Sequence, residues 1–454
     1  MTANDWDIAV SGGTLLTLSE QLDVIEDALV GIKDGSICFI GNKCDAQTMG
    51  VHAAEAIDAS GCIIMPGLIN THTHLPMVCF RGMADDLPLK EWLENHIFPA
   101  EGRFVNKQMV YDGSLLAIAE MILSGTTTFC DGYFFEDKVA EAAVAAGMRA
   151  VVAQGFADFA MPDRFARKNV MAEAERFVRQ WQSHAPMISP AFFCHAPYTC
   201  STETLTTVKQ AARASGILYL THLLETKDEI AQSEAQHGKK PVQYLYDLGV
   251  LDDRTICVHC NWLSEEDMGI LAGCGVKVSH NPESSMKLAA GIASVPAMLE
   301  RGMVVGLGTD GSASNNDLDM FGEMDSAAKI HKAVSLDPTV MDARTVLRMA
   351  TIEGAKALGL EKITGSIEIG KQADLIIVNM RKPHLTPIYN YYSQLVYAVT
   401  GADVQTSIIG GKIVMKDRKL MTMDVQRVME NVCTIAENIK QERGERYFGN
   451  RCAK

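Results

Sequence analysis

Eight short apolar segments, each followed by a longer stretch of helical pattern, occupy the middle of this chain. An alternation of this kind is typical of βαβ units, which build a parallel sheet. Three of the helical stretches are Lys138–Ala146, Thr202–Ser215 and Ser264–Gly273. The predicted strands are Leu68–His74, Thr126–Asp131, Arg149–Gly155, Ile188–His195, Ile217–Leu223, Thr255–His259, Val276–His280 and Val304–Asp310. Eight such units predict an α/β fold with a closed TIM-type (β/α)8 barrel.

The two ends of the chain have a different pattern, in which apolar and polar residues alternate over short spans. Asp34-Gly35 separates two such spans near the N-terminus, and this dipeptide is a strong signal for a β-hairpin. Gly410-Gly411 marks a second tight turn near the other end. We therefore expect the two ends to pair into one small β module.

The length of 454 residues exceeds what a single hydrophobic core usually serves. The patterns divide it into residues 1–63 as the first part of the β module, 64–365 as the barrel, and 366–454 as the second part of the β module. The last segment includes a charged helix predicted at Val425–Glu445.

Composition excludes several classes of function. A net charge of −15 disfavours binding to nucleic acid, which depends on basic patches. The N-terminus carries acids where a signal peptide needs bases, and no apolar run reaches membrane-spanning length, so we expect a cytoplasmic protein without a membrane partner. Cys257 and Cys260 form a single C-x-x-C, which we interpret as structural because a zinc ribbon needs a second pair.

Half of the 12 histidines stand at the ends of predicted strands, where a barrel places its catalytic groups. A single histidine in such a place is more often a satisfied core residue. Together with one aspartate they predict a metal site. The residues are His72, His74, His195, His222, His259, His280 and Asp310.

The proposed ligands are His72, His74, His222 and Asp310. His72 and His74 point to the same side of their strand because side chains alternate with a period of two. Nitrogen and oxygen donors with one open position describe a catalytic zinc site, with iron or manganese as alternatives. A binuclear site of this kind needs a bridging lysine at the end of the fourth strand, and Phe193-Cys-His-Ala-Pro-Tyr198 has none. We therefore expect one divalent metal per subunit.

Three residues near this site are predicted to move protons or polarise the substrate. Glu225 follows His222 by three residues, so the chain has to leave the strand there to place the carboxylate above the metal. The alternative is that Glu225 is an N-cap or first-turn acid of the next helix. Asp310 would share the proton of the attacking water, and His259 would polarise the atom under attack. His280 has a weaker case and would orient its neighbours.

The connection Leu75–Ser124 after the first strand is unusually long and contains Trp92 and Glu101. Loops at this end of a barrel build the site, so we expect a lid or a substrate wall.

Taken together, these residues resemble the amidohydrolase superfamily, and within it the 5′-methylthioadenosine/S-adenosylhomocysteine deaminases and their chlorohydrolase-like relatives. The resemblance covers nearly the whole chain. It rests on the segments PGLINTHTHLPM, FRGMADDLPLKEWL, HAPYT, THLLET, VHC, SHNPESSMKLA and GTDGSASNNDLDMFGEM.

The resemblance implies a mononuclear metal-dependent barrel with a small β-sandwich domain built from residues 1–63 and 366–454. The same resemblance implies hydrolytic deamination of a purine nucleoside at C6. It also implies that Glu101 binds the ribose hydroxyls and that His195 and Glu225 contact the base, with Asp310 beside the substrate. A homo-oligomer would be usual for such a family.

One departure concerns the substrate. Where some of these deaminases have an arginine that meets the substrate carboxylate, this chain has Gln154, and Arg164 or Arg167 would have to compensate. S-adenosylhomocysteine is therefore a weaker expectation than methylthioadenosine or adenosine. The remaining alternatives are an amidohydrolase for a bare ring, such as guanine, a pterin or a triazine, and a non-catalytic scaffold, against which the intact ligand set argues.

Overall fold

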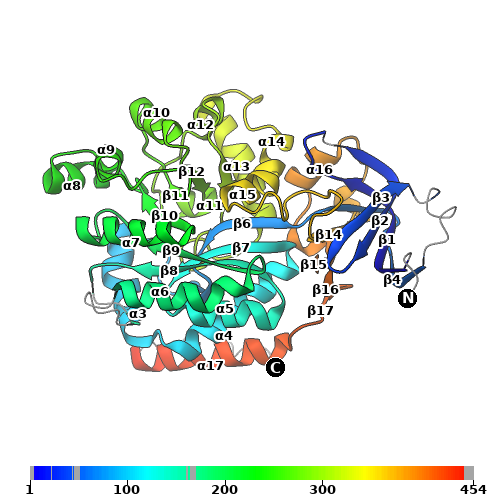
Figure 1. The fold of residues 1–454 in the computed structure, drawn as a ribbon, viewed down its shortest axis with the longest axis horizontal. Helices are drawn as coiled ribbons and strands as arrows, with labels where there is room; N and C mark the ends of the chain where they lie inside the picture. Colours follow the sequence, from blue (N-terminus) through cyan, green and yellow to red (C-terminus); the bar gives the residue numbers. More distant parts are fainter. Residues whose placement is uncertain are drawn as a thin grey trace.

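The computed structural model describes residues 5–21, 23–42, 44, 52–159, 162–163 and 170–443. Eight parallel strands form a sheet in which each strand pairs with its neighbours in chain order (Figure 1). They are β6 (Leu68–Thr73), β7 (Thr126–Tyr133), β8 (Arg149–Phe156), β9 (Ile188–Cys194), β10 (Leu218–Leu223), β11 (Thr255–His259), β12 (Lys277–His280) and β13 (Val305–Leu307). Every predicted barrel strand is present.

The first and last strands are joined by hydrogen bonds that close the barrel. The Asp310 N–H donates to the His72 carbonyl oxygen over 3.0 Å. The Thr71 hydroxyl donates to the Leu307 carbonyl oxygen over 2.9 Å. The prediction of a (β/α)8 barrel is therefore confirmed.

The last strand is shorter than the predicted Val304–Asp310. Asp310 has a positive φ of 61°, which is incompatible with an extended strand. The chain leaves the sheet before this residue, so Asp310 stands in the loop above the barrel.

Helices surround the barrel and cover the outer face of its strands (Figure 1). The predicted helix Thr202–Ser215 matches α7 at both ends. At its start, the Ser201 side chain accepts a hydrogen bond from the Thr204 N–H. Ser264 and Asp267 form a capping box at the start of α10. The barrel helices are α4 (Lys107–Leu123), α5 (Glu136–Ala146), α6 (Val170–Trp181), α7 (Thr202–Ser215), α8 (Asp228–His237), α9 (Pro241–Asp247), α10 (Glu265–Gly273), α11 (Pro282–Lys287), α12 (Val295–Glu300), α13 (Met320–Ser335), α14 (Ala343–Met349) and α15 (Ile352–Ala357).

The long connection after β6 is folded into short helices. They are η1 (Leu75–Phe80), α2 (Leu89–Trp92), η2 (Leu93–Ile97) and α3 (Phe98–Phe104). Trp92 and Ile97 are buried, so this segment is packed against the barrel.

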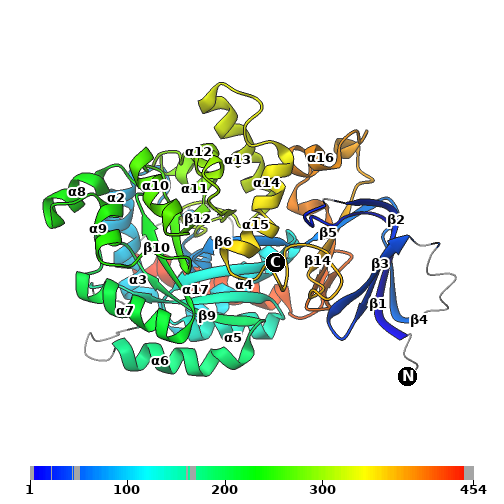
Figure 2. The same ribbon diagram turned by 45° about the horizontal axis from the view of Figure 1, so that its top comes forward.

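A second, mixed sheet is built from both ends of the chain (Figure 2). Its strands run in the order β17-β16-β15-β14-β5-β1-β2-β3, and β4 pairs with β1. Their bounds are β1 (Asp5–Leu16), β2 (Val24–Lys33), β3 (Ser36–Asn42), β4 (His52–Asp58), β5 (Cys62–Pro66), β14 (Leu375–Asn379), β15 (Val404–Ile409), β16 (Lys412–Lys416) and β17 (Lys419–Leu420). The antiparallel pair β5–β14 joins the N-terminal strands to the C-terminal ones, as the sequence predicts.

Both predicted tight turns are present in this sheet. Asp34 and Gly35 have φ of 50° and 78°, and Gly410 and Gly411 have φ of 53° and 72°. Left-handed values at both central residues are those of the hairpin turns that suit the twist of a sheet. The domain boundaries at residues 63 and 365 stay a prediction.

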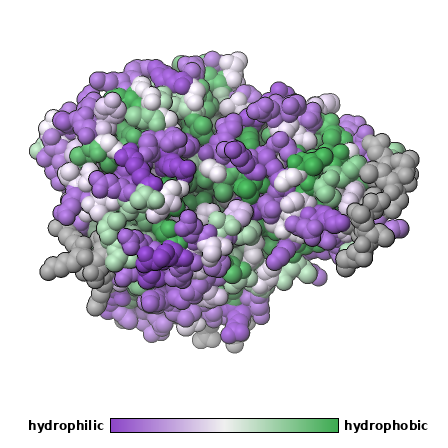
Figure 3. All heavy atoms as spheres, in the orientation of Figure 1, coloured by the Kyte–Doolittle hydropathy of each residue, from purple (hydrophilic) through white to green (hydrophobic). Residues whose placement is uncertain are grey.

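The C-terminal segment contains α16 (Tyr391–Tyr397) and α17 (Val425–Arg443), and Glu445 of the predicted helix lies outside the described residues. No helix in the described part of the chain is long and apolar enough to span a membrane. Hydrophilic residues cover much of the face in Figure 3, with hydrophobic residues gathered in smaller patches between them.

Candidate active site

The backbone is strained where the barrel strands end. Leu224, His259 and Asp310 have positive φ angles of 51°, 71° and 61°. Non-glycine residues rarely adopt such values, and the values concentrate at functional sites. The strain turns the chain sharply after β10, β11 and β13, and so brings polar side chains over the mouth of the barrel.

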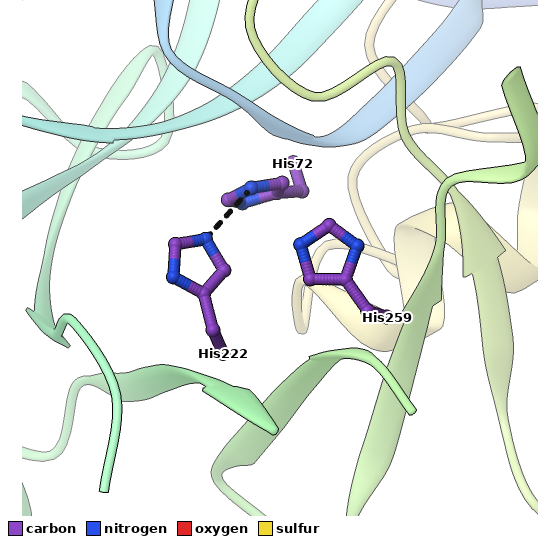
Figure 4. Close-up of side chains that lie close together, drawn as sticks. All are labelled: His72, His222 and His259. Atoms are coloured by element: carbon purple, nitrogen blue, oxygen red, sulfur yellow. Dashed lines mark hydrogen bonds between the residues drawn. The ribbon is translucent and has the colours of Figure 1, made fainter. Parts of the chain in front are cut away.

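Four side chains form a compact set of metal donors. Asp310 Oδ1 lies 3.4 Å from His72 Nε2 and 3.4 Å from His74 Nε2. His222 Nε2 also lies 3.4 Å from His72 Nε2. Figure 4 shows a ring nitrogen of His222 directed toward a ring nitrogen of His72, with His259 beside them. Tetrahedral zinc with bonds of about 2.1 Å separates its donors by about 3.4 Å. These three separations fit such an ion. Three triads of described residues have donor atoms close enough to hold one: His72, His222 and His259; His72, His74 and Asp310; and Glu225, His259 and Asp310.

The protonation states suit ligands. Burial lowers the pKa of His72 to about 4 and that of His222 well below the usual range, so both rings are neutral and have a free lone pair. Burial alone would raise the pKa of Asp310, but a hydrogen bond to His72 and the neighbouring histidines lower it well below its usual range. An ionised carboxylate and neutral imidazoles are the forms that bind metal.

Neighbouring groups fix two of these side chains in place. His74 Nδ1 lies 2.6 Å from the Gly132 carbonyl oxygen, so Nδ1 donates and Nε2 is the free nitrogen. Asp310 Oδ2 accepts hydrogen bonds of 2.7 Å from the hydroxyls of both Ser284 and Ser314. Such outer contacts orient metal ligands.

Glu225 lies beside this set, as the sequence predicts. Its Oε1 is 3.9 Å from His259 Nε2, and burial raises its pKa well above the usual range. The alternative that Glu225 caps the following helix is wrong. The N-cap of α8 is Lys227, and Glu229 accepts the hydrogen bonds from the Leu224 and Thr226 N–H groups.

A cavity with an empty volume of about 730 Å³, including its opening to solvent, connects these groups with Glu101. His74, His222, Glu225, His259 and Asp310 line it on one side. Much of the remaining wall is apolar and includes Leu89, Trp92, Ile97, Phe134, Phe159 and Leu288. The long connection after β6 therefore forms part of the cavity wall, and its role as a substrate wall stays a prediction.

Two polar groups of this cavity have defined partners. Glu101 Oε1 accepts a hydrogen bond of 2.6 Å from the Tyr133 hydroxyl, and burial raises the pKa of Glu101 to about 7. His195 Nδ1 lies 2.9 Å from the Thr199 hydroxyl, which itself donates to the Ala196 carbonyl. Because that hydroxyl has one proton, His195 donates from Nδ1, which leaves its Nε2 as an acceptor.

Other predicted residues lie outside the cluster. His280 Nε2 is 3.0 Å from His331 Nε2, and His280 is absent from the cavity wall formed by described residues. Gln154 donates hydrogen bonds of 3.2 Å to the Gly155 carbonyl and to Asp163, and is likewise absent from that wall. Arg164 and Arg167 lie outside the described residues. Cys257 and Cys260 are buried thiols, in accordance with a structural role.

Sequence reasoning missed the residues that support the cluster. Ser284 and Ser314 lie inside two of the segments that carry the resemblance, but only their contacts with Asp310 reveal a role. The Tyr133 hydroxyl is missed for the same reason, since its partner Glu101 is 32 residues away.

Comparison with known proteins agrees with this geometry. A sequence profile of the Amidohydrolase family matches residues 63–414. The chain is 49% identical to a 5-methylthioadenosine/S-adenosylhomocysteine deaminase of Syntrophobacter fumaroxidans, over 96% of this chain and 98% of the relative. It is 47% identical to a 5′-deoxyadenosine deaminase of Methanosarcina mazei, over 95% of this chain and 98% of the relative.

Among solved structures, an adenosine deaminase of Xanthomonas campestris with bound zinc superposes with a TM-score of 0.94. It shares 38% identity, over 96% of this chain and 99% of that one. The profile, the relatives and the metal donors lead to one conclusion: this chain belongs to the amidohydrolase family.

Proposed function

We propose that this protein is a metal-dependent aminohydrolase that removes the 6-amino group of an adenosine-type nucleoside. Water is consumed, ammonia is released and the inosine analogue remains. The observation that carries the proposal is that one cavity is lined by three of the proposed metal ligands, by the acid Glu225 and by the carboxyl group of Glu101. Deaminases of this class among the relatives support it.

His72, His74, His222 and Asp310 would hold one divalent ion, and we propose zinc. When bound, such an ion lowers the pKa of a water molecule and so makes a nucleophile available at neutral pH. The zinc of the related adenosine deaminase structure supports this choice.

Glu225 is proposed to deliver a proton to the purine ring nitrogen next to C6. Its raised pKa keeps a proton on the carboxyl group near neutral pH. His259 would polarise C6 as its amino group leaves, and the ionised Asp310 would accept the proton of the attacking water. These residues therefore divide the tasks of acid, polarising group and base.

The nucleoside would be held at both of its ends. His195 and Glu225 would contact the base, and Glu101 would accept hydrogen bonds from the ribose hydroxyls. The apolar wall around Trp92 and Phe159 favours an uncharged 5′ substituent. Gln154 is bonded to Asp163 and offers the cavity no cation. We therefore propose methylthioadenosine, 5′-deoxyadenosine or adenosine ahead of S-adenosylhomocysteine.

The direct test incubates zinc-loaded protein with these four compounds and with guanine. Ammonia release and the ultraviolet shift from adenine to hypoxanthine are followed together. We expect turnover of the adenosine compounds and none of guanine. Turnover of guanine alone would overturn the proposal in favour of a bare-ring amidohydrolase.

We further propose a homo-oligomer, on the strength of the family resemblance. Light scattering on the purified protein tests this. A cytoplasmic location likewise stays a prediction.

A further inference from the structure

Two fully buried carboxyl groups lie next to the proposed site and have no part in the mechanism above. Asp131 is in β7, and Glu136 is the first residue of α5. Both are 0% exposed. Buried acids of this kind are costly unless each oxygen has a partner.

One oxygen of each acid has a clear partner. Asp131 Oδ1 accepts a hydrogen bond of 2.6 Å from the N–H of Leu75, the residue after His74. Glu136 Oε1 accepts one of 2.7 Å from the N–H of Tyr133. The two acids therefore tie together the segments that follow β6 and β7.

The other two oxygens have only each other. Asp131 Oδ2 and Glu136 Oε2 are buried and receive no hydrogen bond from any other described group, while the two carboxyl groups contact one another. Two ionised carboxylates offer acceptors only, so they repel at this distance. A single proton between them removes the repulsion and supplies the missing donor. Burial raises the pKa of both groups, to about 6 for Asp131, in agreement with a retained proton.

Gly132 and Tyr133, which lie between the two acids in the sequence, contact two residues of the cavity wall. The Gly132 carbonyl accepts the hydrogen bond from His74 Nδ1. The next residue, Tyr133, donates its hydroxyl hydrogen to Glu101. A shift of Gly132 and Tyr133 would therefore move a proposed metal ligand and a proposed ribose contact together.

We propose that Asp131 and Glu136 share one proton and act as positioning residues, so that one hydrogen-bonded unit sets both His74 and Glu101. The part that concerns Glu101 rests on the proposed function. The shared proton and the link to His74 do not.

A double-mutant cycle tests the shared proton. In Glu136→Gln the new amide NH2 replaces the shared proton and donates to an ionised Asp131. In Asp131→Asn the new amide NH2 donates to an ionised Glu136. Each single variant therefore keeps a complete pair. In the double variant the backbone N–H groups of Leu75 and Tyr133 donate to the two amide oxygens, so the two NH2 groups are left facing each other. The structure thus predicts that two tolerated changes become harmful when combined.

We expect each single variant to retain zinc and to raise KM for a nucleoside less than about 1.5-fold, with kcat unchanged. The double variant should raise KM at least about tenfold and lose zinc more readily in a chelator titration, well beyond the product of the single effects. The control is Asp137→Asn, which removes the next acid of α5, bonded instead to Arg176 and Trp181. It should resemble the unmodified protein.

Infrared difference spectroscopy gives a readout that is independent of turnover. Relative to the unmodified protein, one carbonyl band of a buried protonated acid, that of the Asp131–Glu136 pair, should be lost in either single variant, because each leaves one ionised carboxylate beside an amide. It should persist in Asp137→Asn. The inference would be overturned if the effect of the double variant on KM equalled the product of the two single effects. It would also be overturned if the infrared band were unchanged in both single variants. Failure of the proposed function alone would abolish turnover in every protein and leave the zinc and infrared results unaffected.

Discussion

A buried ion pair at one end of the barrel and the histidine cluster at the other differ in how far their polar groups are paired. At the N-terminal end of β8, Arg149 is fully buried and all of its side-chain nitrogens are bonded. Its Nε and Nη2 donate to Asp374 over 2.6 and 3.0 Å, and its Nη1 donates to the Pro186 carbonyl over 2.8 Å. Asp374 also accepts a hydrogen bond of 2.6 Å from the Gly410 N–H. This network joins the barrel to the second sheet.

At the opposite end, the strands are followed by residues that have unpaired side-chain nitrogens or a strained backbone. His72 Nδ1 and His259 Nδ1 are buried without a hydrogen bond among the described residues, and His259 and Asp310 have positive φ angles. Native proteins rarely leave such groups unsatisfied unless a ligand or a function uses them. The difference indicates that one end of the barrel stabilises the fold and the other binds and reacts.

The largest effect is expected from a change in the proposed active site that leaves the stability of the fold intact. Glu225→Gln keeps the shape of the side chain but removes its acid, so kcat should fall about 10²–10⁴-fold. Zinc content and the unfolding temperature should stay unchanged. Steady-state assays with metal analysis check this, and normal turnover in this variant would remove Glu225 from its role.

The matching change at the stabilising end is Arg149→Met. It leaves the Asp374 carboxylate buried without its cation, so unfolding free energy should fall by about 3–5 kcal/mol. Turnover per folded molecule should not change. Denaturant unfolding and activity at low temperature measure the two quantities. Replacing both partners by apolar residues should cost less than Arg149→Met, and a larger loss would contradict this account of the pair.

A smaller effect is expected from the serines that hold Asp310. Ser314→Ala removes one of two hydrogen bonds to Oδ2, so zinc affinity should weaken about 10–100-fold. Competition with a chromogenic chelator measures it. Ser393→Ala, on the distant helix α16, is the control. Equal affinities in the two variants would mean that Ser314 does not position the ligand.

The smallest effect is a dependence of KM on pH. Burial raises the pKa of Glu101 to about 7, so the carboxylate is present above this value and is lost as the pH falls through it. An acid that has gained a proton accepts hydrogen bonds from ribose hydroxyls less well, so KM for nucleosides should rise by up to about tenfold per pH unit below 7. Glu101→Gln should remove this slope. A slope that persists in this variant would place the titrating group elsewhere.

The sequence predicted the barrel and its cluster because both follow from local rules. A strand period of two placed His72 and His74 on one side, and the eightfold alternation placed all the cluster residues at one end of a barrel. The departure of the chain from β10 before Glu225 followed from the same period.

Other features of the site depend on contacts that no local pattern reports. The hydroxyls of Ser284 and Ser314 reach Asp310 only after the loops that follow β12 and β13 have packed together. The positive φ of His259 occurs at a residue type for which no turn signal predicts it. The end of β13 was placed too late, at Asp310, because the backbone turn after Leu307 has no signal in the sequence that places it before Asp310.

The most direct measurement is a zinc titration of metal-free protein, with ammonia release from methylthioadenosine followed at each step. We predict no turnover without metal, a linear rise of the rate with added zinc, and a plateau at one zinc per chain. Glu225→Gln should bind one zinc per chain but remain nearly inactive. Full turnover in metal-free protein, or a plateau reached only at two ions per chain, would contradict the single metal centre at His72, His74, His222 and Asp310.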